Sequence, residues 1–173
     1  MGESTGAGVI FGTTGGVMEA ALRSVSEILT GEELEKIEFK EIRGEQGIKR
    51  ASLKLGERDI KVVVAHGLGN AQTIMEEIKS GKADYQFVEI MACPGGCVMG
   101  GGQPIHSSKE RAKTDIRKLR ADCLYDIDEK ATIRKSHENP VVKKIYEEYL
   151  GETGGNRAHE LLHTKYVKRK KYD

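Results

Sequence analysis

Residues 62–65 read VVVA, an apolar run with no polar side chain on either face of a strand. Because successive strand residues point to opposite faces, such a run must be covered on both sides and is typical of a central strand. The segments 17–30 and 69–80 carry apolar residues at helical spacing and can provide the covering layers. Alternation of strands and helices predicts the α/β class, with a mixed, mainly parallel sheet covered by helices.

The remaining elements follow from the same periodicities. Ser107 and Glu110 form a capping-box pattern, which predicts the start of a third helix. The helices at 69–80 and after 107 are expected to bury one apolar stripe each. The predicted strands are 8–12, 37–43, 47–55, 59–65 and 85–91. The predicted inward residues are Ala71, Ile74, Met75 and Ile78 in the second helix, and Ala112, Ile116, Leu119 and Cys123 in the third.

The character of the chain changes after about residue 128, because no further strand is predicted. Asn139 and Pro140 supply an N-cap and a first helical residue for a short helix that Gly151 closes. A last helix is predicted at 156–164. We therefore divide the chain into a lobe, residues 1–128, and a C-terminal helical strap, residues 129–173. The short helix is expected to pack through Val142, Ile145, Tyr146 and Tyr149.

Composition excludes several functional classes. The chain has 28 basic and 27 acidic residues, so it offers no bulk attraction for nucleic acid, and residues 168–171 are expected to be a solvated basic tail. No apolar run approaches membrane-spanning length, and the N-terminus lacks the pattern of a signal peptide. Three cysteines are too few for a disulfide framework, which favours a reducing, cytoplasmic location.

The stretch MACPGGCVMGGGQP, residues 91–104, directly follows the strand predicted at 85–91. Sheets of the α/β class place ligands at the carboxyl ends of strands, and Gly95 and Gly96 allow the backbone to approach a cofactor closely. Cys93 and Cys97 offer soft thiolate ligands for an iron–sulfur cluster, zinc or copper(I). Two thiolates are half of a four-thiolate site, so these residues favour half of a metal site over a redox dithiol or two unreactive thiols.

The complete string at 91–104 resembles a signature of the iron-only (FeFe) hydrogenases. TGAGVIFGTTGGVMEAALRS, residues 5–24, resembles another stretch of the same catalytic domain. NPVVKKIYEEYLG (139–151) and RAHELLHTKY (157–166) resemble the small-subunit segment of that family, here fused to the large one. The resemblance covers nearly the whole chain, and its motifs occur in the order found in the family.

The resemblance implies that Cys93 and Cys97 are two of four thiolates that hold the 4Fe–4S part of an H-cluster. It also implies that Cys97 bridges to a two-iron subsite, and that Met91, Phe11 and Val17 line the pocket around that subsite. The implied reaction is the reversible reduction of two protons by two electrons to dihydrogen, which a dry apolar pocket would favour. Ferredoxin or an NAD(P)-linked protein would exchange electrons, and separate maturation proteins would build the subsite.

Parts of the family pattern have no counterpart in these 173 residues: two further cluster cysteines, a proton-relay cysteine and ferredoxin-like cysteine runs. We therefore expect the C-terminal part of a hydrogenase that needs an N-terminal lobe or subunit, is inactive alone and does not hold the complete cofactor. Cys123 is expected to be a small core residue on its helix. Two alternatives stay open: a non-catalytic, hydrogenase-like iron–sulfur assembly protein, and a hydrogen sensor with the same fold.

Two further motifs invite other functions. HELLH, residues 159–163, has the H-E-x-x-H form of zinc proteases, but none of the ten residues after His163 is His or Glu. We therefore expect Leu161 and Leu162 to anchor the strap instead. GTTGG at 12–16 precedes a helix and could cradle an anion, although it lacks the Lys-Ser/Thr of a P-loop.

Overall fold

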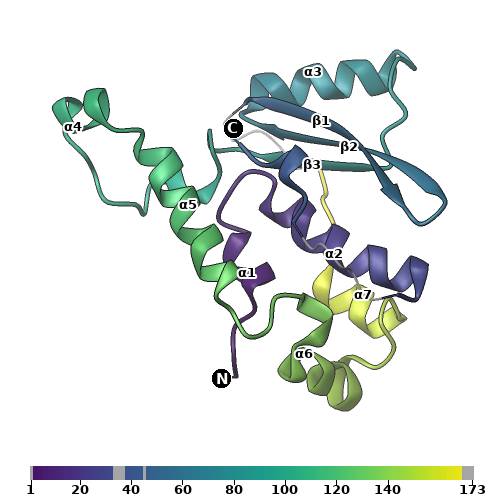
Figure 1. Cartoon of the computed structure of the whole chain (residues 1–173). Coiled ribbons are helices and arrows are strands. Elements are labelled where there is room, and N and C mark those ends of the chain that lie inside the picture. Colours follow the sequence, from purple (N-terminus) through teal and green to yellow (C-terminus); the bar gives the residue numbers. More distant parts are fainter. Residues whose placement is uncertain (1, 33–37, 45, 169–173) are drawn as a thin grey trace.

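The fold is seen in a computed structural model that describes residues 2–32, 38–44 and 46–168 (Figure 1). Three strands form one sheet in the order β1-β2-β3: β1 (Ile48–Leu55), β2 (Arg58–His66) and β3 (Phe87–Met91). β1 and β2 form an antiparallel hairpin, whereas β2 and β3 are parallel. The predicted α/β class and mixed sheet are confirmed, but the sheet is not mainly parallel, because one of its two strand pairings is antiparallel. The apolar run at 62–65 lies in the central strand.

Two helices cover the sheet, one on each face (Figure 1). Val62 and Val64 face α2 (Gly16–Thr30) and pack with Met18 and Leu22, whereas Val63 faces the other side. That side is covered by α3 (Leu68–Lys79), which lies above the strands in Figure 1. Its only buried residue is Ile74; Met75 and Ile78, both predicted to point inward, are exposed. α3 is therefore a thin cover, and the larger core lies under α2.

Two predicted strands are wrong. Residues 6–10 form a short helix, α1 (Gly6–Ile10), because the Thr5 hydroxyl caps it by accepting the Gly8 N–H at 3.0 Å. Gly6 packs so closely on Asp128 that an added Cβ would lie 2.1 Å from a carboxylate oxygen. The strand predicted at 37–43 is instead a 3₁₀ turn, η1 (Lys40–Ile42), and residue 37 lies outside the described residues.

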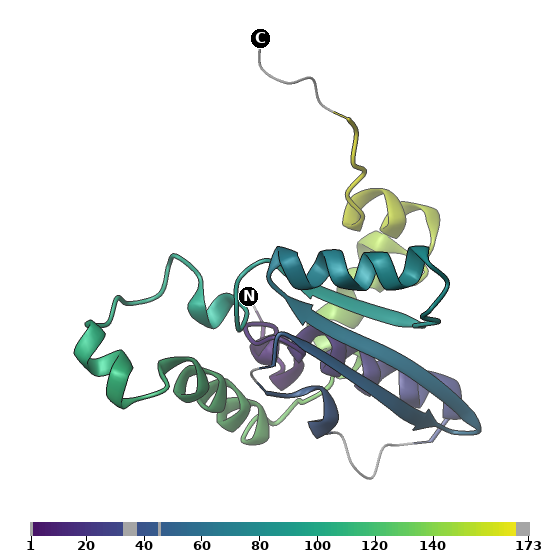
Figure 2. The ribbon, with the colours of Figure 1, turned by 90° about the horizontal axis from the view of Figure 1, so that it is seen from above.

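The third predicted helix is divided. The capping box at Ser107 is present and begins α4 (Ser108–Lys113), and the Asp115 carboxylate then caps a separate helix, α5 (Ile116–Glu129). Figure 1 and Figure 2 both show α4 projecting away from the sheet. The break separates Ala112 from the stripe on α5, and no part of the chain that the structure describes covers that stripe, so Ala112, Leu119 and Cys123 are exposed. The core position predicted for Cys123 is therefore wrong.

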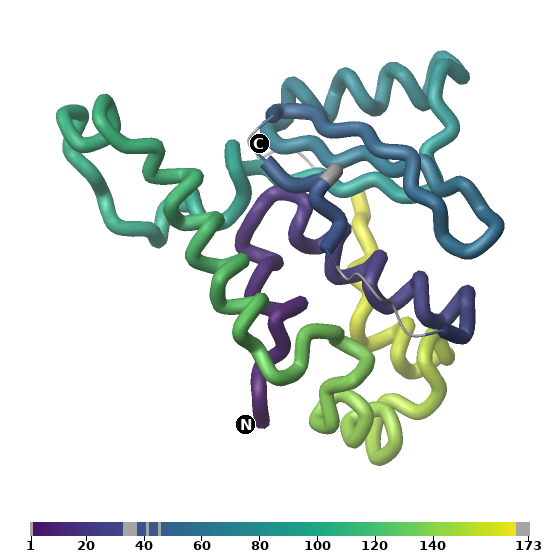
Figure 3. Tube along the Cα trace, in the orientation of Figure 1, coloured from purple at the N-terminus to yellow at the C-terminus, as the bar shows by residue number. Residues whose placement is uncertain are grey.

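The C-terminal segment lies on the side of α2 that faces away from the sheet (Figure 3). It contains η3 (Ser136–Glu138), α6 (Pro140–Ile145), a π-helical turn η4 (Tyr146–Leu150) and α7 (Asn156–Leu162), and Asn139 caps α6 as predicted. Its buried apolar residues are Leu150 and Ala158. The predicted packing residues Val142, Ile145, Tyr149, Leu161 and Leu162 are exposed. Lys168 is exposed, and the rest of the basic tail lies outside the described residues.

Buried ion pairs fasten these layers together. The fully buried Arg23 of α2 donates to Glu19 at 2.8 Å and to Asp128 of α5 at 2.7 Å. Arg134 donates to the second oxygen of Asp128 at 2.8 Å, which extends the network to the start of the strap. Burial alone would raise the pKa of Asp128. Hydrogen bonds from Arg23 and Arg134 outweigh burial and leave that pKa below its ordinary value of 3.8.

We expect Asp128→Asn to destabilise the chain by roughly 3 kcal/mol at neutral pH, because the fully buried Arg23 and the half-buried Arg134 lose their shared anion. Asp128 is charged above its lowered pKa, so its contribution is present above about pH 4 and is lost as the pH falls through that pKa. The variant should therefore lose less stability than the native chain between pH 4 and 2. Urea unfolding at several pH values measures both effects. Asp122→Asn, at an exposed pair with Lys118, is the control and should change stability by less than about 0.5 kcal/mol.

Candidate functional site

The cysteine loop, residues 92–99, begins where β3 ends at Met91. Its first part is a tight turn in which the Gly96 N–H donates to the Cys93 carbonyl at 3.0 Å. Gly95 and Gly96 have φ values of +84° and +96°, a region that side-chain-bearing residues rarely adopt. A 3₁₀ turn, η2 (Cys97–Met99), completes the loop. Both thiols are free and exposed, so the loop presents two soft ligands on an open surface.

A second loop, the Thr13–Gly16 turn between α1 and α2, packs against the cysteine loop. The Thr14 N–H donates to the Gly95 carbonyl at 3.1 Å, and the Val98 N–H donates to the Gly12 carbonyl at 3.0 Å. Gly96 lies between these bonds. An added Cβ there would be 2.8 Å from both the Gly12 oxygen and the Thr14 nitrogen. The structure thus brings together the two sequence stretches, 5–24 and 91–104, that the hydrogenase resemblance singled out.

The apolar residues predicted for the pocket lie around this junction. Met91 is half-buried, and its sulfur lies 3.0 Å from the position that a Cβ on Gly96 would take. Phe11 is 46% exposed at the C-terminal cap of α1, and the half-buried Val17 lies in the first turn of α2. Phe11 and Val17 therefore flank the Thr13–Gly16 turn, while Met91 lies beneath the cysteine loop.

Two buried charged residues of the site were not predicted. Glu89 of β3 is 7% exposed and accepts the N–H groups of Gly15 and Met18, each at 2.6 Å. Lys49 of β1 is 4% exposed and donates to the Thr14 and Gly44 carbonyls at 2.8 and 3.0 Å. The anion that the glycine-rich turn cradles is thus a carboxylate of the same chain. The sequence signal that could have identified Glu89 is its position inside the otherwise apolar strand FVEIM.

Behind the cysteine loop, a cleft of about 750 Å³ lies between α5 and residues 38–44. Its floor includes Gly95, Thr14 and Tyr125, but neither Cys93 nor Cys97 lines it. Burial raises the pKa of Tyr125 to about 12, so the phenol stays protonated at neutral pH. The lining carries both basic and acidic side chains. The cleft therefore has no field of one sign that would select an anion or a cation.

The histidines of HELLH lie side by side on α7 and its C-terminal cap. The rings of His159 and His163 stack with centroids 4.0 Å apart, and both residues are exposed. Residues 164–168, the part of the tail that the structure describes, contain no further His, Cys, Asp or Glu. The two imidazoles alone do not make the three-ligand centre of a zinc protease.

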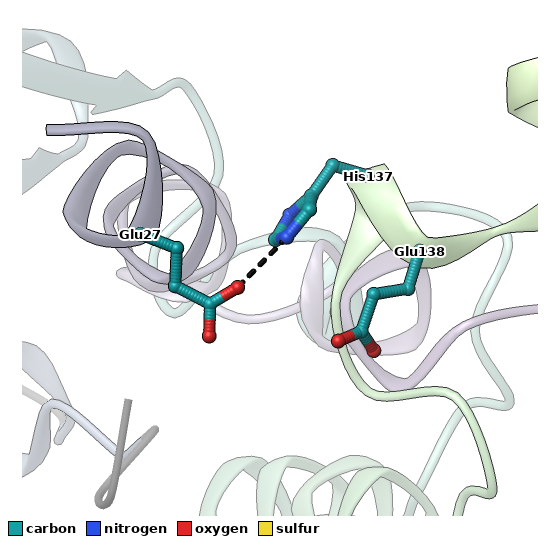
Figure 4. A group of neighbouring side chains, drawn as sticks. All are labelled: Glu27, His137 and Glu138. Carbon is teal, nitrogen blue, oxygen red and sulfur yellow. Dashed lines mark hydrogen bonds and ion pairs between the residues drawn. The ribbon is translucent and has the colours of Figure 1, made fainter. Parts of the chain in front are cut away.

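One cluster in the described residues has the residue types of a metal site: Glu27, His137 and Glu138 (Figure 4). A cation of the chain already occupies it, because the Lys135 ammonium lies 2.6 Å from Glu27 and 2.9 Å from Glu138. His137 bonds through its two ring nitrogens to Glu27 at 2.8 Å and to Ser24 at 2.9 Å. The cluster therefore fastens the strap to α2 by charges that are satisfied internally.

Fold and loop together define an α/β lobe that presents two exposed thiols beside a glycine-rich turn. Residues 1–101 match the family "Iron only hydrogenase large subunit, C-terminal domain", and residues 114–169 match "Iron hydrogenase small subunit". The chain belongs to the iron-only hydrogenase family, with large-subunit and small-subunit segments joined in one polypeptide.

Relatives and solved structures agree with this assignment. The chain is 49% identical over 168 residues to iron hydrogenase 1 of Clostridium pasteurianum, covering 97% of this chain and 29% of the relative. It is 46% identical over 171 residues to the NADP-reducing hydrogenase subunit HndD of Solidesulfovibrio fructosivorans, covering 99% and 28%. A variant of the FeFe-hydrogenase HydA1 from Chlamydomonas reinhardtii superposes with a TM-score of 0.70 at 42% identity, covering 96% of this chain and 47% of that one.

The family also includes relatives whose names describe another function. A probable cytosolic Fe-S cluster assembly factor of Aedes aegypti is 32% identical over 155 residues, covering 88% of this chain and 31% of the relative. The chain spans less than a third of each of these three curated relatives. Family membership by itself therefore does not distinguish hydrogen chemistry from cluster assembly.

We expect Gly96→Ala to displace the cysteine loop, because the new Cβ would collide with the Gly12 carbonyl and φ is +96°. The cost should be roughly 2 kcal/mol in unfolding free energy, measured by urea denaturation. Gly101→Ala is the matched control, since Gly101 has no atom within 4 Å of an added Cβ and no positive φ. Equal stability of the two variants would contradict the close packing described above.

Proposed function

We propose that this chain is the C-terminal part of an iron-only hydrogenase that catalyses the reversible reduction of protons to dihydrogen. The observation that carries the proposal is the pair of exposed thiols, Cys93 and Cys97, on a loop that one backbone hydrogen bond fixes to Thr14 and another to Gly12. Family membership and the likeness to solved FeFe-hydrogenases support it.

The donor set fits an iron–sulfur cluster. Thiolates are the soft ligands that such clusters use, and Cys93 and Cys97 would provide two of the four that a 4Fe–4S cluster requires. In this proposal Cys97 would also help to hold the two-iron subsite, and the complete H-cluster would supply the redox chemistry. Because the Gly96 N–H and the Gly95 carbonyl are engaged within the protein, we propose that both glycines act by allowing the loop conformation and the close approach of the cofactor.

The apolar neighbours of the loop would exclude water. Met91, Phe11 and Val17 surround the junction of the cysteine loop and the Thr13–Gly16 turn, and none carries a charge or a strong hydrogen-bonding group. In a site closed by a second lobe they would leave a dry pocket in which polar interactions strengthen. We assign them to the lining of that pocket.

The other two thiolates would come from an N-terminal lobe or subunit. The open faces of Cys93 and Cys97 and the exposed apolar residues Phe11, Met99 and Leu119 suit such a neighbour. Alone, the chain would be inactive and without the complete cofactor. Ferredoxin or an NAD(P)-linked protein would exchange electrons, and maturation proteins would deliver the two-iron subsite. No helix among the described residues is long and apolar enough to cross a membrane, and a cytoplasmic location stays a prediction.

A non-catalytic role in iron–sulfur cluster assembly is the second candidate. The similarity to a relative named as a cytosolic Fe-S cluster assembly factor favours it. It would use Cys93 and Cys97 as cluster ligands in the same way, so the two functions differ in hydrogen chemistry and not in the ligand set. A hydrogen sensor with the same fold stays open as a third reading.

We expect the chain, co-expressed with the maturation proteins and the N-terminal lobe of Clostridium pasteurianum iron hydrogenase 1, to retain iron and sulfide and to evolve hydrogen. Cys93→Ser and Cys97→Ser should each remove most of the cluster-bound iron, because serine is a poor substitute for a thiolate. Cys123→Ser is the matched control and should keep the iron content of the native chain, since Cys123 is on α5. Iron and sulfide analysis with EPR spectroscopy measures retention.

Hydrogen evolution from reduced methyl viologen separates the candidates. A stable cluster without hydrogen evolution would favour the assembly function or the sensor. Unchanged iron content in both cysteine variants would contradict the ligand assignment. Hydrogen evolution by the chain without any partner would contradict the half-site account.

A further inference from the structure

The sheet carries two buried, opposite charges in one row beneath α2. In the strand register, Lys49 of β1 is paired with Val64 of β2, and Val64 is paired with Glu89 of β3. Paired residues in adjacent strands place their side chains on the same face, and Val64 belongs to the core under α2. Lys49, Val64 and Glu89 therefore point toward the same helix, with the aliphatic residue between the two charges.

The glutamate replaces the missing cap of α2. Gly15 is the N-cap residue of this helix and has no side chain that could satisfy the first N–H groups. The Glu89 carboxylate accepts from Gly15 with one oxygen and from Met18 with the other, both at 2.6 Å. An anion at a helix N-terminus also complements the helix dipole.

Lys49 binds the same turn through a backbone carbonyl, whereas Glu89 binds it through backbone N–H groups. Its ammonium donates to the Thr14 carbonyl at 2.8 Å and to the Gly44 carbonyl at 3.0 Å. The N–H groups that follow Thr14 are thus held by an anion, and the Thr14 carbonyl is held by a cation. Burying two charges is costly, so their presence at this turn calls for a role beyond filling space.

The clamped turn is the part of the lobe that holds the cysteine loop. Thr14, whose carbonyl binds Lys49, donates its own N–H to Gly95. Gly12 accepts from Val98. These two bonds bracket Gly96 and Cys97, so the position of Cys97 depends on Thr14 in the Thr13–Gly16 turn and on Gly12 immediately before it.

We propose that Glu89 and Lys49 are positioning residues for the Cys97 thiolate. They clamp the Thr13–Gly16 turn from two strands. The turn transmits its position to Cys97 directly through the bond from Thr14 to Gly95, and through the adjoining Gly12 to Val98. The relevance to cluster binding rests on the proposed function. The dependence of the Cys97 position on Glu89 and Lys49 involves only residues of this chain and does not require a cluster.

Amide hydrogen exchange of the 173-residue chain tests the coupling without any cofactor. In Glu89→Gln a side-chain NH₂ group replaces one acceptor oxygen and faces a backbone donor. We expect exchange at Thr14 and Val98 to accelerate roughly tenfold, the effect of losing one buried hydrogen bond. The amide of Val63, in the centre of the sheet, should keep its rate. Lys49→Met should also accelerate exchange at Thr14 and Val98. If Glu89→Gln does not fold, the exchange rates of Lys49→Met test the proposal.

Glu77→Gln is the matched control. Glu77 is on α3, across the sheet, and its carboxylate also has two partners, Arg50 at 2.5 Å and Tyr85 at 2.9 Å. In Glu77→Gln the amide exchange rates of Thr14 and Val98 should stay within twofold of the rates in the native chain. Rates that stay within twofold in Glu89→Gln and Lys49→Met, or that rise equally at Val63, would overturn the proposal.

A second measurement connects the clamp to the ligand. In the complex with an N-terminal hydrogenase lobe, Glu89→Gln should shift or broaden the EPR spectrum of the reduced cluster, while Glu77→Gln should not. An unchanged spectrum despite faster exchange at Val98 would overturn the positioning of Cys97. If no variant or native complex binds a cluster, the proposed function fails, and the exchange rates still decide whether the clamp exists.

Discussion

The close approach of two glycine-containing backbones is the constraint on which the site depends. Gly96 lies against Gly12 and Thr14 with no room for a Cβ, and the backbone bonds from Thr14 to Gly95 and from Val98 to Gly12 hold the two segments together. About 80 residues separate them in the chain, so the contact exists only once α2 has packed on the sheet and β3 has paired with β2. The remainder of the lobe can be understood as the scaffold that produces this contact.

That scaffold depends strongly on buried charge. Only 38% of the residues are hydrophobic, and α3 contributes one buried residue to its side of the sheet. Glu19, Arg23 and Asp128 join α2 to α5, while Glu89 and Lys49 join the sheet to the turn that begins α2. Paired buried charges are directional and fail when one partner is lost, so they specify how elements meet more than they add to stability. Such joints suit a lobe whose elements must present ligands accurately.

Sequence periodicity predicted α2, α3, β1, β2 and β3, because these elements have strong apolar patterns. It failed at residues 8–12, where the short apolar run GVIFG resembles a strand but the Thr5 cap and the fit of Gly6 against Asp128 select a helix. The cysteine loop could be located from composition alone. The Glu89–Lys49 clamp could not, since strand register and the direction of a buried charge are tertiary properties.

The wrong prediction for α5 is itself informative. The sequence places Leu119, Cys123 and Ile127 at helical spacing, a pattern that normally faces a core, yet in this chain all three residues are exposed. α1 packs against a different side of α5, where Asp128 and Tyr125 lie. An apolar stripe that the chain's own fold leaves uncovered is expected where another lobe completes the core. It supports the proposal, from evidence independent of the cysteines, that a neighbouring lobe packs against this chain.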